Sequence, residues 1–168
     1  MSDIAESIAG AVKYLAANPE KARYADSPAT AKIDGLRSTV SGPDGATLVS
    51  DMPTGVGGAA SAPTPGWLMR AALASCDATL IAMRAATEGI TLDTLEVTVD
   101  GESDNRGLFG IDDQTPAGPL YMRVSVRIGA SGVDPDRLRE IVHWADQHSP
   151  VGDAIRRAVP TTVDVETI

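Results

Sequence analysis

The segment 65–88 constrains the fold more than any other part of this 168-residue chain. From Leu68 to Met83 its apolar and small side chains cover nearly every direction around a helix. A helix that is apolar on one side lies on a surface, whereas one that is apolar all round is buried. Pro65 suits the first helical turn, and Gly89 suits the position just after the end. We therefore predict a central helix over 65–88 that other elements must surround.

The remaining apolar patterns predict strands and helices packed around this helix. Ser2 is a candidate N-cap for the N-terminal helix over 3–17. A Gly-Pro-Asp-Gly turn over 42–45 predicts a hairpin between the first two strands. The order is β-β-α-β-β-α-α-β after an N-terminal helix, which indicates an α+β fold with a mostly antiparallel sheet. Strands are expected over 31–41, 46–52, 91–101, 119–129 and 160–166. Helices are expected over 3–17 and 65–88, from Pro135 with an apolar stripe that reaches Ala145, and after Pro150.

Length and composition predict one compact domain over 30–168, preceded by a helix and an extension over 1–29. The net charge of −9 disfavours a nucleic-acid partner and an acidic membrane surface, because both require a basic face. One cysteine and two histidines indicate no metal site, and we expect no cofactor. The chain shows no signal-peptide pattern and no apolar run of about 20 residues. We therefore expect a cytoplasmic protein.

Cys76 is the only cysteine, and it falls inside the predicted central helix. A lone thiol there is either an inert, small core residue or a sheltered nucleophile. Asp77 follows it, and a carboxylate in so apolar a helix must be paired or lie at an interface. The sequence leaves both readings of Cys76 open.

Four motifs occur in a characteristic order and spacing. The first is the proline-led helix that reaches Leu73-Ala74-Ser75-Cys76, and the second is the Asp104–Gly110 loop between two strands. The third is Ala117-Gly118-Pro119 at the start of a strand, and the fourth is Trp144–Val151 near the last helix. Together they resemble the OsmC/Ohr family of thiol-dependent organic hydroperoxide reductases over roughly residues 30–166. The family commonly has Cys-Pro-Val where this chain has Ser149-Pro150-Val151.

The resemblance implies a homodimer in which two sheets wrap around two central helices, with the site at the subunit interface. Cys76 falls at the family's peroxidatic cysteine, and Ser149 falls at its second, resolving cysteine. Arg37 is the candidate for the arginine that stabilises the thiolate, with Arg106 as a further candidate. The family's peroxide-reducing enzymes often carry a glutamate after the proline of the central helix, where this chain has Gly66.

With Ser149 in place of the second cysteine, the resemblance implies a one-cysteine mechanism in oxidative stress defence. Oxidised Cys76 would wait as a sulfenic acid for a small or lipoyl thiol reductant, because Ser149 cannot form a disulfide. Ser149 also reads as the N-cap of the last helix, and its neighbour His148 is a candidate proton donor. The alternative is a non-catalytic homodimer that binds a small apolar ligand at the subunit interface. A third reading makes helix 3–17 a surface for interaction with other proteins.

Overall fold

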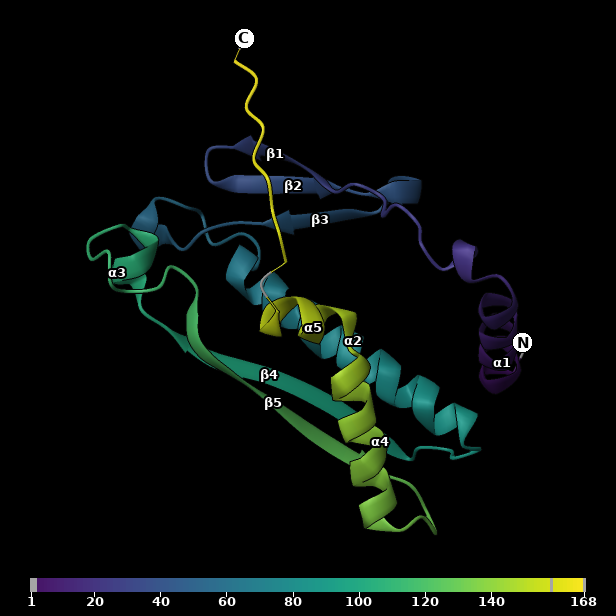
Figure 1. The fold of residues 1–168 in the computed structure, drawn as a ribbon. Helices are drawn as coiled ribbons and strands as arrows, with labels where there is room; N and C mark the ends of the chain where they lie inside the picture. The colour runs from purple at the N-terminus through teal and green to yellow at the C-terminus, as the bar shows by residue number, and fades with distance from the viewer. Residues whose placement is uncertain (1–2, 158, 168) are drawn as a thin grey trace.

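The computed structural model describes residues 3–157 and 159–167. It has an α+β fold with antiparallel sheets, as predicted (Figure 1). Ser2, the expected cap of the first helix, lies outside the described residues, and Asp3 accepts the capping hydrogen bond from Ala5 N at 2.9 Å. The elements are α1 (Ile4–Ala17), β1 (Thr30–Asp34), β2 (Arg37–Ser41), β3 (Thr47–Ser50), α2 (Pro65–Thr87), β4 (Thr94–Ser103), α3 (Asn105–Leu108), β5 (Pro119–Gly129), α4 (Pro135–His148) and α5 (Pro150–Arg156).

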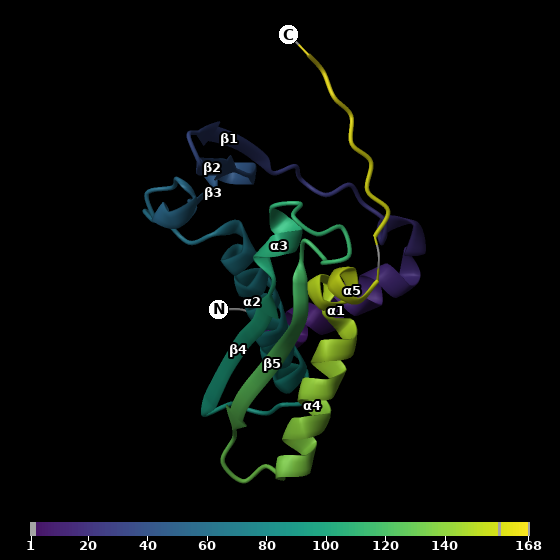
Figure 2. The ribbon, with the colours of Figure 1, turned by 90° about the vertical axis from the view of Figure 1, so that its left-hand side faces the viewer.

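The described strands form two separate antiparallel sheets, β1-β2-β3 and β4-β5. In the long β4–β5 ladder Val97 lies opposite Val126 and Leu95 opposite Ile128, so one face is apolar. That face packs on α2 and α4, while the three-stranded sheet stands beyond the N-terminal end of α2 (Figures 1 and 2). Within the described residues, no helix is both long and apolar enough to cross a membrane.

The first predicted strand, 31–41, is itself a hairpin. Gly35 has φ +59°, a left-handed conformation that glycine adopts without strain, and it turns the chain between β1 and β2. The predicted turn over 42–45 then joins β2 to β3. The prediction of two strands here was therefore wrong, because it missed the turn at Gly35, and the segment forms three strands.

The predicted strand over 160–166 does not form. Residues 159–167 carry neither helix nor strand, and Val163 and Val165 are 83% and 81% exposed. A strand needs a neighbouring edge that supplies backbone hydrogen bonds. This segment leaves the body of the chain (Figure 1) and pairs with none of the described strands.

The core lies where α2 and α4 meet the β4–β5 sheet. Ile81 and Ala85 of α2 pack with Ile141 and Ala145 of α4, and all four are buried. α2 begins where Thr64 accepts a hydrogen bond from Trp67 N at 3.2 Å, with Pro65 in the first turn. This half of the central helix is buried as predicted.

The other side of α2 is exposed in a single chain. It carries small residues, Ala72, Ser75, Thr79 and Ala82. Near the end of α2, α1 packs against Leu80 and Met83, but none of the described α1 side chains is buried. One chain therefore covers only part of a helix whose sequence is suited to burial on all sides.

Candidate functional site

The fold brings Cys76 of α2 together with Ser149, which joins α4 to α5. The Ser149 hydroxyl donates a hydrogen bond to Cys76 Sγ at 3.4 Å. The same oxygen accepts from Gly152 N at 3.1 Å, so Ser149 caps α5 as predicted. Ser149 is 0% exposed, whereas Cys76 is half-buried. The Gly152 amide holds the hydroxyl oxygen in place, and the hydroxyl proton of Ser149 remains available to the sulfur of Cys76.

Gly152 makes room for this contact. A Cβ at position 152 would lie 3.1 Å from both the Cβ and the Oγ of Ser149. A larger residue would therefore press the hydroxyl away from its present place. The close approach of α5 to Ser149 thus depends on a residue without a side chain.

Asp77 is 3% exposed, and its Oδ1 atom has no hydrogen-bond partner among the described residues. Burial raises the pKa of the Asp77 carboxyl, and the negative charge of Asp146 adds to that effect. The Ser149 hydroxyl and Arg156 act in the opposite direction. Because Ser149 has one hydroxyl proton, which is directed at Cys76 Sγ in the structure, it can serve only one of its two neighbours at a time.

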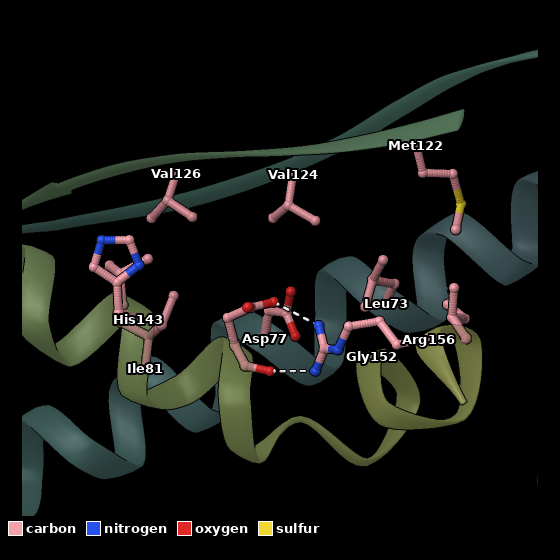
Figure 3. A pocket seen from close by; sticks show the side chains of 12 residues that line it. Leu73, Asp77, Ile81, Met122, Val124, Val126, His143, Gly152 and Arg156 are labelled. Atoms are coloured by element: carbon pink, nitrogen blue, oxygen red, sulfur yellow. Dashed lines mark hydrogen bonds and ion pairs between the residues drawn. The ribbon is translucent and has the colours of Figure 1, made fainter. Parts of the chain in front are cut away.

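Asp77 lines a cavity of about 420 Å³ between α2, β5, α4 and α5 (Figure 3). At its rim, Arg156 Nη1 bonds Asp146 Oδ1 at 2.9 Å and Nη2 bonds the Asp146 carbonyl at 2.6 Å. The Asp146–Arg156 pair was not foreseen, since ten residues and a helix boundary separate the two. Apolar side chains make up most of the remaining wall: Leu73, Ile81, Met122, Val124, Val126, Val142 and Ile155.

Arg37 lies in the three-stranded sheet, away from the Cys76–Ser149 contact. Its Nε donates to Ser61 Oγ at 3.3 Å, and that hydroxyl donates to Asp51 Oδ2 at 2.7 Å. The hydrogen bonds from Ser61, backbone and side chain, lower the pKa of Asp51. Within one chain Arg37 therefore bonds the loop before α2 and not Cys76.

Two other predicted site residues are engaged elsewhere. Arg106 Nη2 bonds Asp104 Oδ2 at 2.5 Å, and this pairing lowers the pKa of Asp104 to about 2. His148 Nδ1 lies 2.7 Å from the carbonyl oxygen of Trp144, and its ring stacks on the Trp144 ring at 4.2 Å between centroids. Of the candidates named from sequence, the structure gathers Cys76, Asp77 and Ser149.

A second cavity, of about 550 Å³, lies at the N-terminal end of α2. Gly66 contributes to its wall together with Met69 and Arg70. The opposite wall includes Leu108 and Phe109 from the segment that contains α3. This cavity is mostly apolar, and Arg70 and Asp104 give it one charge of each sign.

Replacing Asp77 with asparagine is expected to stabilise the protein at neutral pH. Since burial raises the pKa of Asp77, the folded chain binds a proton where the unfolded chain has released it, and stability falls as the pH rises through that range. The Asp77→Asn variant should therefore gain free energy of unfolding at pH 7 and lose that gain near pH 4, the usual pKa of an unfolded aspartate. Urea denaturation at both pH values measures the difference in free energy of unfolding between the variant and the wild type. Asp113→Asn, at an exposed position, is the control. If Asp77→Asn differs from the wild type by the same free energy of unfolding at both pH values, the prediction is wrong.

Comparison with known proteins gives a consistent result. A family model described as OsmC-like protein matches residues 57–164. Similar solved structures include an organic hydroperoxide resistance protein OsmC from Legionella pneumophila (24% identity, 80% of this chain, 91% of that chain, TM-score 0.59). An OsmC like protein from Mycoplasma pneumoniae has 14% identity, covers 81% of this chain and 91% of that chain, and has a TM-score of 0.68.

The organic hydroperoxide resistance protein OhrB of Bacillus subtilis is also similar, with 20% identity, 80% of this chain, 93% of that chain and a TM-score of 0.53. No curated protein matches the chain. At these identities the solved structures share a fold with this chain, and their names describe those proteins alone.

Proposed function

The chain belongs to the OsmC-like protein family, and from that premise we propose that it reduces organic hydroperoxides through Cys76, with an external thiol as reductant. The observation that carries the proposal is the contact between Cys76 Sγ and the buried Ser149 hydroxyl at 3.4 Å. Two of the similar structures bear the name organic hydroperoxide resistance protein, which agrees with this chemistry.

The Ser149 hydroxyl supports the first step. A hydrogen bond donated to sulfur favours the thiolate, which is the nucleophilic form of cysteine. The thiolate attacks the terminal oxygen of the hydroperoxide, the O–O bond breaks, and Cys76 becomes a sulfenic acid. The leaving alkoxide takes up a proton and departs as the alcohol.

The second step needs a reductant from outside the chain, because Cys76 is the only cysteine. One external thiol attacks the sulfenic sulfur, which releases water and forms a mixed disulfide. A second thiol then releases the external disulfide and returns Cys76 to its thiol. Small thiols or a lipoyl dithiol fit this role in the cytoplasm, and the reaction would serve oxidative stress defence.

The positive charge for the site would come from a second copy of the chain. We propose a homodimer in which Arg37 of one subunit approaches Cys76 of the other, since within one chain it bonds Ser61. The exposed small residues along α2 support this arrangement. They would let two central helices approach closely, and the second subunit would cover the part of α2 that one chain leaves open.

Peroxide consumption tests the proposal directly. Purified protein is mixed with cumene hydroperoxide and dihydrolipoate, and hydroperoxide loss is followed while mass spectrometry reports oxidation at Cys76. We expect Cys76→Ser to lower the rate by roughly 100-fold or more, because a serine hydroxyl is a much weaker nucleophile than a thiolate. Ser27→Ala, at an exposed position outside the helices and strands, should keep the rate. An unmodified Cys76 with no hydroperoxide consumed would refute the proposal.

A second candidate function is binding of a small apolar ligand without chemistry, at a subunit interface. The cavity of about 550 Å³ at the N-terminal end of α2 favours it, because Gly66 there leaves space where a glutamate would supply an acid. Native mass spectrometry of the protein as purified would reveal such a ligand. Rapid hydroperoxide turnover without bound ligand would exclude this candidate.

A further inference from the structure

We propose that the cavity between α2, β5, α4 and α5 binds a small organic amine, whose apolar body fills the cavity and whose ammonium group pairs with Asp77. The site differs from the thiol chemistry proposed for Cys76 and does not depend on it. Figure 3 shows Asp77 in the wall, with the side chains of β5 on the other side of the cavity.

The first reason is the unpaired oxygen of Asp77. This side chain is 3% exposed, and Oδ1 has no hydrogen-bond partner among the described residues. A buried acceptor without a donor costs free energy, more so when it is charged. A ligand that brings a donor to Oδ1 would remove that cost.

The second reason is the balance of charge around the cavity. Asp146 and His143 face it from α4, Arg156 faces it from α5, and Cys76 is the neighbour of Asp77 on α2. Arg156 is already bound by the carboxylate and carbonyl of Asp146. Arg156 still lowers the pKa of Asp77 through its charge, but among the described residues that line the cavity none forms an ion pair with Asp77.

The third reason is the apolar wall, which selects the rest of the ligand. From β5 the cavity receives only Met122, Val124 and Val126. A free metal ion would find too few ligands, since the described residues hold no cluster of three or more histidine, cysteine or acidic side chains suited to one. An anion would be repelled by Asp77 and Asp146. A neutral alcohol would bond Oδ1 but leave the buried charge uncompensated.

Three ligands of one shape separate these possibilities: benzylamine, benzyl alcohol and benzoate. Isothermal titration calorimetry with the full chain should show binding of benzylamine, at least about tenfold weaker binding of the alcohol, and none of benzoate. Asp77→Asn should weaken benzylamine binding by about tenfold or more, while Asp113→Asn, an exposed carboxylate elsewhere, should not change it. Thermal unfolding of each variant verifies that it folds.

Cys76→Ser should bind benzylamine like the wild type, so failure of peroxide reduction and failure of this site are distinguishable. Binding should also weaken as the pH falls and Asp77 takes up a proton. Three outcomes would overturn the proposal: no binding of benzylamine, equal binding of benzylamine and benzyl alcohol, or unchanged affinity in Asp77→Asn.

Discussion

Replacing Ser149 with cysteine is expected to make peroxide oxidation end in a disulfide between positions 76 and 149 instead of in sulfinic acid. In the wild type the Ser149 oxygen lies 3.4 Å from Cys76 Sγ, so a sulfur at that place needs only a small movement to form the bond. A thiol there would attack the sulfenic acid as soon as it forms, and this intramolecular step outruns further oxidation.

Mass spectrometry after excess cumene hydroperoxide measures this change. Ser149→Cys should lose two hydrogens and recover with a reductant, whereas the wild type should gain two oxygens at Cys76 irreversibly. Ser27→Cys is the matched control, because it adds one thiol at an exposed position outside the helices and strands. If both variants overoxidise like the wild type, the contact between Cys76 and Ser149 is not present in solution.

Replacing Ile141 with alanine is expected to lower the free energy of unfolding by about 2–5 kcal/mol. Ile141 is 1% exposed and packs with Ile81, Ala85 and Ala145 at the centre of the core. Truncation of a buried isoleucine removes apolar contact and leaves a cavity, and both effects destabilise the folded chain. The expected fall in melting temperature is about 2–4 °C for each kcal/mol in a protein of this size.

Urea denaturation monitored by tryptophan fluorescence measures the free energy of unfolding. Ile111→Ala is the control, because Ile111 is 71% exposed and loses little on truncation. A loss in Ile141→Ala no larger than in the control would show that α4 does not pack on α2 as described.

The helices were the part of the fold that the sequence predicted best. Pro65, Pro135 and Pro150 each stand in the first turn of a helix, and the end of α2 falls within a residue of the prediction. Strands were less certain because their pairing depends on distant partners. The turn at Gly35 splits an otherwise continuous pattern, and the alternating segment 160–166 finds no edge within one chain.

The candidate site was predictable only in part. Ser149 was expected near Cys76 through the family resemblance, and the structure places the two in contact. Arg37 bonds Ser61 because the loop before α2 folds back on β2, and no local sequence pattern predicts that fold of the loop. The cavity beside Asp77 depends on four elements meeting, and the Trp144–Val151 motif, which contains Asp146, gives no sign of its pairing with Arg156.

The buried hydroxyl of Ser149 connects Cys76 with Asp77. Its single hydrogen is donated to Cys76 Sγ, and the same hydroxyl also lowers the pKa of the Asp77 carboxyl, so the two groups compete for one donor. A cation that satisfies Asp77 would free the hydrogen for the sulfur. An occupied cavity would leave the hydrogen bond to Cys76 Sγ undisturbed, whereas in an empty cavity the sulfur and the carboxylate compete for the same donor.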